Sequence, residues 1–404
     1  MNSVQKFIHI HRTRSRLLDC FRSAGIFFTR SRGDRTQYIY PRIHSIKPKQ
    51  EENKTEIVFT LRNGMDPKEI KKKEYVFRQY FSKQIDIKGD LKHFTLFVYH
   101  KPLPSQYTYN YDEFYPVIKD MALPFVLGRN INGSMEVIDL LKVPHPLVAG
   151  ETGSGKSSLL RVVLTTLIKL KRPEELEIYL ADCKRSEFSI FKNAEMVKCV
   201  YHKPADIRRM LKGIAAEMDR RSALTEMYQV PHIDDLPAEH RLKYILVCID
   251  EFVRLKSDKE IQSILVDLVS VGRSLGVICL LSMQRPSGDI LDTSVRAQLT
   301  ARIAFQVEDA INARIIGVEG AEKIKEPGTM RAKIKGELKE IKAPFLEMED
   351  AKELLSPFCV AKGPVKPIKD GNSSPAPLIL EKEEMTDRGE MVKSDGDINL
   401  FMED

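Results

Sequence analysis

The sequence has no tryptophan, only six cysteines and no long apolar segment among its 404 residues. No two cysteines form the CxxC pair that is typical of zinc sites and redox motifs, so we expect reduced and mostly buried thiols. The most apolar stretches, residues 244–249 and 276–281, are far shorter than the roughly 20 residues that a membrane-spanning helix needs. The amino terminus lacks the sustained apolar region of a secretory signal. These absences favour a protein of the cytoplasm.

Charge is distributed unevenly along the chain, although the net charge of +7 is modest. Residues 1–50 carry eleven lysines and arginines and two acids, whereas residues 370–404 carry ten acids. The basic segment, which we place at residues 1–36, could contact phosphate groups or could be a solvated, partly disordered arm, and the sequence leaves both readings open. Beyond about residue 363 the composition shifts to proline, serine, glycine and acids, which predicts a disordered acidic tail.

Two parts of the chain alternate strand and helix patterns. The first predicts a small α/β unit with strands over 37–46, 55–61 and 92–99, a helix over 67–81 and then a linker over 101–115. The second begins near Leu123 and predicts a mostly parallel sheet with helices on both faces, with strands over 144–149, 176–182, 243–249, 276–282 and 301–307 and helices over 157–170 and 205–228. We therefore expect a basic arm (1–36), a small α/β domain with a linker (37–120), a large α/β domain (121–345) and a short helix with an acidic tail (346–404).

The segment from Gly150 to Ser157 reads Gly-Glu-Thr-Gly-Ser-Gly-Lys-Ser, a complete phosphate-binding loop of the Walker A type. It follows an apolar segment and precedes a predicted helix, as the mechanism requires, because the helix amino terminus and the loop amides then face the phosphates. Lys156 would neutralise phosphate charge, and the Ser157 hydroxyl would bind Mg²⁺. The residues expected to contact ATP are Gly150, Glu151, Thr152, Gly153, Ser154, Gly155, Lys156, Ser157 and Ser158.

An acidic element of the Walker B type, the partner of the Walker A loop, follows the apolar strand over 243–249. Asp250 at its end is expected to hold Mg²⁺ through water, and the adjacent Glu251 to act as the general base that polarises the attacking water. We expect the strand over 176–182 to lie between the Walker A and Walker B strands, which is the RecA-like arrangement of P-loop NTPases. Gln284, just after the next strand, is then expected to sense the γ phosphate.

Several ordered motifs resemble the FtsK/SpoIIIE family of DNA-translocating ATPases over residues 121–335. Beyond the loop itself, these motifs are Leu127-Gly128, Asp139-Leu140, Pro144-His145, Asp182-Cys183-Lys184, Glu217 to Arg221, Gly272-Arg273, Gln284-Arg285-Pro286 and Arg302 to Val307. The resemblance implies a homo-oligomeric ring, expected to be hexameric, that moves double-stranded DNA and places each ATP between subunits. It implies a neighbour's arginine at each site, for which Arg273 is the candidate and Arg302 the runner-up, a surface ion pair being the alternative for either.

The layout differs from that of the large family members, because neither membrane helices nor a carboxy-terminal winged-helix module is found in this sequence. A compact motor with a small basic amino-terminal domain looks more like the FtsK-like coupling ATPases of conjugative elements and plasmids in Gram-positive bacteria. That resemblance implies a relaxase or a membrane-bound transfer protein as a partner, with recruitment to the membrane. Two other readings remain open: an ATPase that drives protein secretion, and a DNA-binding regulator switched by ATP.

Overall fold

The computed structural model describes residues 3–32, 35–49, 54–82, 84–100, 107–130, 133–285, 296 and 298–360. The predicted acidic tail lies outside these residues. Within the described parts of the chain, no helix has the length and apolar character needed to cross a membrane.

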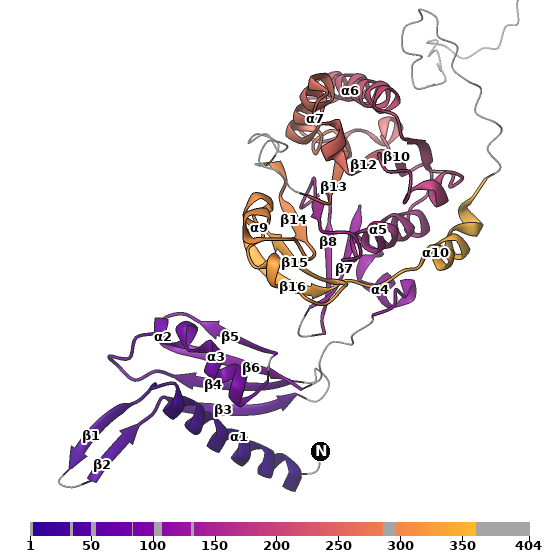
Figure 1. Ribbon diagram of the computed structural model, residues 1–404. Coiled ribbons are helices and arrows are strands. Elements are labelled where there is room, and N and C mark those ends of the chain that lie inside the picture. The colour runs from indigo at the N-terminus through magenta and orange to yellow at the C-terminus, as the bar shows by residue number, and fades with distance from the viewer. Residues whose placement is uncertain are drawn as a thin grey trace, which may run out of the picture. The chain divides into compact units, whose positions relative to one another are not determined.

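The amino-terminal part is a four-stranded antiparallel sheet in the order β3-β4-β6-β5, with a helical face (Figure 1). Its strands are β3 (Arg42–Lys49), β4 (Lys54–Thr60), β5 (Ile85–Gly89) and β6 (His93–Tyr99), and its helices are α1 (Ser3–Ser23), α2 (Lys68–Lys72) and α3 (Glu74–Tyr80). Phe21 of α1 contacts Phe59 of β4 and Phe77 of α3, with ring centroids 5.1 and 6.0 Å apart. One apolar core therefore joins both helices to the same face of the sheet.

The segment expected as a solvated arm is, over most of its length, the helix α1, and in this respect the arm prediction is wrong. Leu17, Cys20 and Phe21 recur at helical spacing and are fully buried, whereas Arg12 and Arg16 are exposed. The helix is amphipathic, and its charges cover only the side away from the core. After it, β1 (Phe28–Arg32) and β2 (Arg35–Ile39) pair as an antiparallel hairpin.

Two expected elements of this part are each divided in two. The strand expected over 37–46 is interrupted at Tyr40 and Pro41, which belong to neither β2 nor β3, because proline cannot donate a ladder hydrogen bond. The helix expected over 67–81 breaks into α2 and α3 at Lys73, which has φ −98° and ψ 12°. Strands β3 and β4 pair antiparallel.

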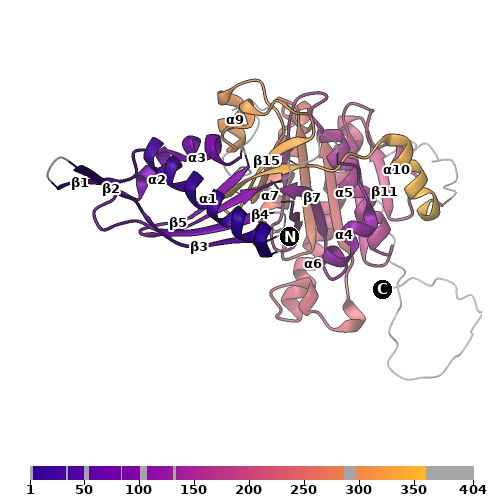
Figure 2. The ribbon, with the colours of Figure 1, turned by 90° about the horizontal axis from the view of Figure 1, so that it is seen from below.

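The second part contains a ten-stranded sheet in the order β11-β10-β12-β13-β9-β14-β15-β16-β7-β8 (Figures 1 and 2). The strands from β11 to β14 in this order are parallel, and the remaining pairings are antiparallel. The strand bounds are β7 Pro124–Asn130, β8 Met135–Asp139, β9 Leu147–Ala149, β10 Leu176–Asp182, β11 Val197–Tyr201, β12 Tyr244–Asp250, β13 Val277–Met283, β14 Ala301–Ala304, β15 Thr329–Ile334 and β16 Glu337–Lys342. The predicted mostly parallel α/β sheet is confirmed.

Helices cover both faces of this sheet, as predicted. Helix α5 (Lys156–Leu170) packs on one face, against alternate strand residues such as Val148 and Leu246. Helices α6 (Pro204–Met227), α7 (Lys259–Val271) and α9 (Ala310–Ile316) pack on the other, against residues such as Leu147 and Val247. Because successive strand residues point to opposite faces, the buried strands are apolar throughout.

The expected linker and the expected boundary at residue 345 both fall inside packed structure. Tyr107, Tyr109 and Phe114 are buried, and helix α4 (Tyr111–Ile118) begins after Asn110, whose side chain accepts a bond from the Asp112 amide at 3.0 Å. At the other end, helix α10 (Met348–Leu355) is joined to the same core through Leu346 and Ala351. These segments pack onto the domain because burying their aromatic and aliphatic side chains lowers the free energy of the folded chain. The large domain therefore begins before residue 121 and continues past residue 345.

The strand between β9 and β12 in the sheet is β13, and not the strand over 176–182 that we expected there. That strand, β10, pairs with the opposite edge of β12, with Asp182 in register with Asp250. One edge of β12 is thus taken by β10 and the other by β13. The strand that carries Gln284 at its end is therefore inserted between the Walker A and Walker B strands. The RecA-like arrangement holds with a different strand in that place.

Candidate active site

The Walker A loop leaves the carboxyl end of β9 and enters α5. Gly153 has φ +81° and Gly155, the residue before the helix, has φ +117°, both in the left-handed region that favours glycine. A side chain at Gly155 would come within 3.0 Å of the Phe305 ring and 3.1 Å of Gly328. The loop is thus closely packed from behind, and its amides precede a fifteen-residue helix whose positive dipole end faces the same space.

Hydrogen bonds hold the loop against the sheet. The Glu151 amide donates to the Gln306 carbonyl at 3.0 Å, and the Gly328 amide donates to the Ser154 carbonyl at 2.8 Å. The Ser154 hydroxyl donates to the Glu151 carbonyl at 2.7 Å. The side chain of Thr152 is exposed. These bonds fix the loop in place, and Thr152 and Gly153 at its tip are exposed.

Lys156 and Asp250 form a buried ion pair at the mouth of the loop. The Lys156 Nζ lies 2.5 Å from the Asp250 Oδ1 and donates to the Ser282 hydroxyl at 2.9 Å, and Ser282 also bonds to the same carboxylate. Lys156 and Asp250 are 3% and 2% exposed. Three strands thus deliver one cluster: β9 through the loop, β12 through Asp250 and β13 through Ser282.

Glu251 adopts a left-handed backbone conformation, with φ +53°, immediately after β12. Its carboxylate is buried and accepts a bond from the Gln284 amide at 3.3 Å, while the Lys184 Nζ lies 2.9 Å from its other oxygen. A left-handed non-glycine residue is uncommon and concentrates at functional sites. The predicted base and the predicted sensor are therefore joined directly, through the backbone of Gln284. The Gln284 side chain itself is half-buried.

Lys184 is a site residue that the sequence motif contains but to which we assigned no role. It follows β10, where the buried Asp182 carboxylate accepts bonds from the amides of Lys184, Ser186, Glu187 and Phe188 at 3.1 to 3.3 Å. This turn holds the segment after β10 at the carboxyl end of β12. The signal in the sequence was the Asp182-Cys183-Lys184 motif, in which a lysine lies two residues after a strand-ending aspartate.

Ser157 and Ser158 are placed differently. The Ser158 hydroxyl accepts a bond from the Leu346 amide at 2.9 Å and is buried, so it fastens the segment before α10 to α5. Ser157 is half-buried at the start of the helix. The side chain of Ser158 is thus engaged in packing, and only its amide remains available to a phosphate.

The donor set at this mouth fits Mg²⁺ carried by a nucleotide. Asp250 and Ser157 supply hard oxygen donors, and within the described residues no group of three His, Cys, Asp or Glu side chains could hold a metal ion alone. Mg²⁺ typically keeps waters and takes one or two protein oxygens together with substrate phosphates.

Arg273 and Arg302 both lie at the opposite ends of the strands from Lys156. Arg273 precedes β13, is exposed and donates to the Leu141 carbonyl at 2.9 Å. Arg302, in β14, donates to the carbonyls of Leu299 and Arg296 at 3.2 and 2.7 Å, and burial lowers its pKa. Among the described residues, neither arginine bonds to the phosphate loop of its own subunit. Of the two, Arg273 is the exposed one.

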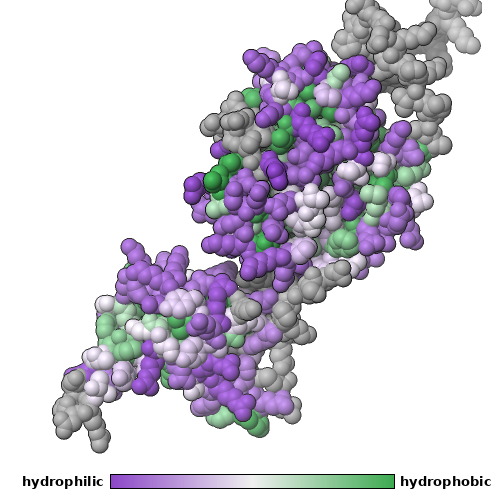
Figure 3. Space-filling view, in the orientation of Figure 1, coloured by the Kyte–Doolittle hydropathy of each residue, from purple (hydrophilic) through white to green (hydrophobic). Residues whose placement is uncertain are grey.

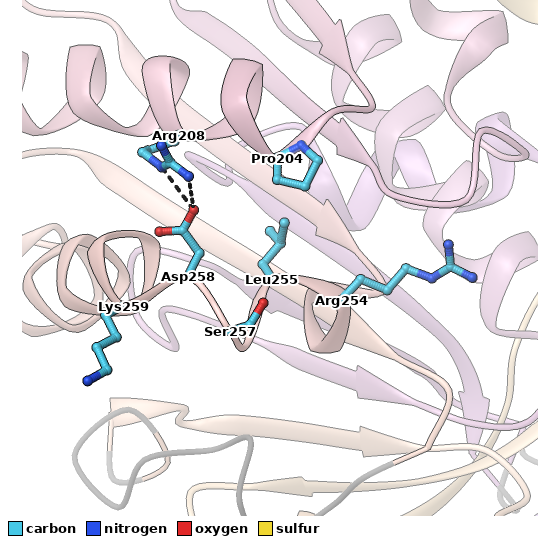
Figure 4. Close-up of a pocket in the computed structure, with 7 residues that line it drawn as sticks. All are labelled: Pro204, Arg208, Arg254, Leu255, Ser257, Asp258 and Lys259. Atoms are coloured by element: carbon cyan, nitrogen blue, oxygen red, sulfur yellow. Dashed lines mark hydrogen bonds and ion pairs between the residues drawn. The ribbon is translucent and has the colours of Figure 1, made fainter.

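A recess opens beside the carboxyl ends of β10 and β12. One side is lined by Pro204, Arg208, Arg254, Leu255, Ser257, Asp258 and Lys259, and Figure 4 shows Arg208 of α6 reaching Asp258 while Arg254 points away from that pair. The two nitrogens of Arg208 lie 2.9 and 2.5 Å from the Asp258 carboxylate. The adjoining side is lined by Cys183, Arg185, His202, Lys203, Pro204, Arg254 and Leu255. On the face shown in Figure 3, the surface is mostly hydrophilic.

Known proteins resemble the part of the chain that carries this site. A model of the FtsK/SpoIIIE family matches residues 118–288. DNA translocase FtsK of Treponema pallidum is 35% identical over 222 residues, and DNA translocase SftA of Bacillus subtilis is 35% identical over 219 residues. Each alignment covers 52% of this chain but only 28% and 23% of the relative, so the chain matches only part of the length of those proteins.

Solved structures share the fold. The pCW3 conjugation coupling protein TcpA, solved with ATPγS, aligns with a TM-score of 0.56 and 20% identity, over 78% of this chain and 93% of that one. The cytoplasmic domain of the type VII secretion ATPase EccC from Thermomonospora curvata aligns with a TM-score of 0.53 and 24% identity, over 60% and 31% of the two chains. The family model thus finds an FtsK/SpoIIIE domain at residues 118–288, and the solved structures share its fold.

Proposed function

We propose that this protein is an ATP-driven motor that translocates double-stranded DNA, and that it acts in the transfer or partition of a mobile element. The observation that carries the proposal is the joining of Lys156, Asp250, Glu251 and Gln284 at one sheet edge, in a domain whose curated relatives are named DNA translocases. A protein that uses ATP only as a switch would not need a base next to a sensor.

The site residues divide the chemistry among themselves. The loop amides and Lys156 bind the phosphates of ATP, for which the Lys156 ammonium exchanges part of its bonding from Asp250 to phosphate oxygen. Ser157 and Asp250 would hold Mg²⁺, which when bound neutralises developing charge on the phosphates. Glu251 accepts a proton from water as the water oxygen bonds to the γ phosphorus and the bond to the β-phosphate oxygen breaks, releasing ADP and phosphate. Gln284, bonded to Glu251 through its amide, senses whether the γ phosphate is present.

Arg273 would complete the site of a neighbouring subunit. It is exposed and lies at the strand ends opposite to Lys156, so its guanidinium can act only across an interface between copies. An arginine supplied in trans makes hydrolysis depend on assembly into a ring, for which we propose six subunits.

The amino-terminal part offers a surface suited to DNA phosphates. Helix α1 exposes Arg12, Arg14 and Arg16 on the side away from its core, and β3 exposes Lys47 and Lys49. Sequence-independent contacts to phosphates are what a motor needs, because it must move along any sequence. The similarity to a conjugation coupling protein supports a role in DNA transfer, with a relaxase or a membrane-bound transfer protein as the partner that recruits this chain.

The decisive experiment for this proposal is ATP hydrolysis by the assembled full chain, with and without linear duplex DNA at low salt. We expect duplex DNA to stimulate turnover. A rate that is indifferent to DNA would remove the motor proposal and favour the secretion reading, which the similarity to EccC keeps open.

A further inference from the structure

Each carboxylate oxygen of the proposed base has a neighbour: Oε2 is in an ion pair, and Oε1 accepts a hydrogen bond. The Lys184 Nζ lies 2.9 Å from Oε2 of Glu251, and the Gln284 amide donates to Oε1. The Glu251 side chain is 8% exposed and that of Lys184 is 23% exposed. Because water screens this pair poorly, its attraction is stronger than that of an ion pair at the surface.

The two partners are held by different loops. The segment after β10 is fixed by the four amide bonds to Asp182, which place Lys184 over the end of β12. Glu251 is fixed by its left-handed backbone and by the bond from the Arg254 amide to its carbonyl at 3.0 Å. The ion pair thus joins the ends of two adjacent strands, and a small shift of either loop changes the distance between its charges.

A carboxylate oxygen that an ammonium already contacts is not open to an attacking water molecule. To take a proton from water, Oε2 of Glu251 must first separate from Nζ of Lys184. We propose that Lys184 is a positioning residue that restrains Glu251, and that the pair must open before ATP is hydrolysed. This inference rests on the proposed role of Glu251 as the base.

The segment that carries Lys184 lies beside a recess at the protein surface. Its neighbours Cys183 and Arg185 both line the recess at the carboxyl ends of β10 and β12. Arg185 has φ +60°, a left-handed conformation that a bulky side chain adopts at a cost of about 1–2 kcal/mol. The Arg254 guanidinium donates to the Cys183 carbonyl at 3.3 Å. The segment around Lys184 therefore contains a left-handed residue and borders the recess, although Cys183 also packs against the core.

The test compares variants of the full chain in ATP hydrolysis, with and without linear duplex DNA. Lys184→Met removes the restraining charge, so we expect the rate without DNA to rise by at least about fivefold. The rate with DNA should stay within about twofold of the wild type, because the pair is already open during stimulated turnover. Lys184 pairs with Glu251 and not with a residue of the phosphate loop, so KM for ATP should not change. Lys184→Arg keeps the charge and should restore the stimulation.

Controls separate a restraint from a purely structural role. Lys198→Met removes a lysine whose Nζ lies 3.2 Å from Glu177 between the neighbouring strands β10 and β11, and it should leave both rates unchanged. Because Lys184→Met leaves a buried carboxylate without its partner, Lys184→Gln, which keeps a donor without the charge, is measured beside it, and thermal unfolding is followed for both.

The outcomes distinguish this inference from the function on which it rests. If Glu251→Gln hydrolyses ATP as fast as the wild type, Glu251 is not the base and the proposed chemistry fails. If Glu251→Gln is slow but Lys184→Met and Lys184→Gln turn over at or below the wild-type rate without DNA, the proposed base stands and the restraint is wrong. A raised rate without DNA in folded Lys184 variants, reversed in Lys184→Arg, supports the restraint.

Discussion

The Lys156 ammonium of the phosphate loop is bonded to the Asp250 carboxylate of the neighbouring acidic element at 2.5 Å, out of contact with solvent. The lysine that we propose binds phosphate and the aspartate that we propose holds Mg²⁺ thus balance each other's charge. Ser282 bonds to both, so β13 takes part in the same cluster.

Lys156→Ala should therefore affect stability as well as turnover. ATP hydrolysis should fall to background, and because Asp250 loses its buried partner, the free energy of unfolding should drop by about 3 kcal/mol. Chemical denaturation measures the drop. Adding Asp250→Asn to Lys156→Ala should recover part of it, whereas Lys198→Ala, at an ion pair of which the lysine is 40% exposed, should change stability by less than about 1 kcal/mol. Equal losses in Lys156→Ala and Lys198→Ala would show that the buried pair does not stabilise the fold.

The two serines after Lys156 should differ in what they support. Ser157→Ala should lower ATP turnover by about a hundredfold with little change in stability, because its hydroxyl is the proposed Mg²⁺ ligand. Ser158→Ala removes the acceptor of the buried Leu346 amide, so stability should fall by about 1–2 kcal/mol while turnover stays within about threefold. Thermal melts and steady-state kinetics on both variants check this. The reverse pattern would exchange the roles of the two serines.

Mixed assemblies should show whether Arg273 acts between subunits. Arg273→Ala and Lys156→Ala subunits should each be inactive alone, but in an equal mixture about one site in four combines an intact lysine with a neighbour's intact arginine. We expect about a quarter of the wild-type rate in that mixture. No recovery would remove Arg273 as the arginine supplied in trans. Arg302→Ala should instead destabilise the fold, because its guanidinium bonds to the carbonyls of Leu299 and Arg296.

The fold should lose stability in mild acid because of His145. This histidine is 1% exposed, accepts a bond from the Cys279 amide, and burial, with the charge of Arg273 in addition, lowers its pKa to about 4. An unfolded chain binds this proton at a pKa of about 6.5, so stability is complete above that pH and falls by on the order of 3 kcal/mol as the pH drops to about 4. Unfolding midpoints measured from pH 7 to pH 4 should show the decline.

His145→Asn should flatten that decline, since asparagine tolerates the left-handed conformation of this position, φ +53°, and keeps an acceptor for the Cys279 amide. The control His240→Asn, at a half-buried position, should keep the wild-type pH dependence. If His145→Asn loses stability in acid as steeply as the wild type, the decline has another origin.

Local patterns were enough to predict the phosphate loop and its acidic partners. Glycines before Lys156, and an apolar strand that ends at Asp250 and Glu251, are signals within short segments, and the structure brings these residues together as expected. The sequence did not reveal the place of β13 between β9 and β12, because strand pairing depends on contacts between distant segments. The same is true of the Lys184–Glu251 pair, which joins two loops far apart in the sequence.

The amino-terminal helix shows a different limit. Leu17, Cys20 and Phe21 have helical spacing, but they lie among many basic residues. The high density of positive charge favoured the prediction of an arm over that of a packed helix. An amphipathic helix needs only one apolar side to be buried, so a high total charge does not predict a solvated chain.

The measurement that tests the central claim most directly is displacement of a third strand from linear duplex DNA. A labelled oligonucleotide that forms a triplex is bound at a site away from the duplex ends, and its release is followed after ATP is added to the assembled chain. A DNA-translocating motor should displace the oligonucleotide with ATP, but not with a non-hydrolysable analogue and not with Lys156→Ala. ATP hydrolysis stimulated by duplex DNA, without displacement of the third strand at any protein concentration, would contradict the motor function.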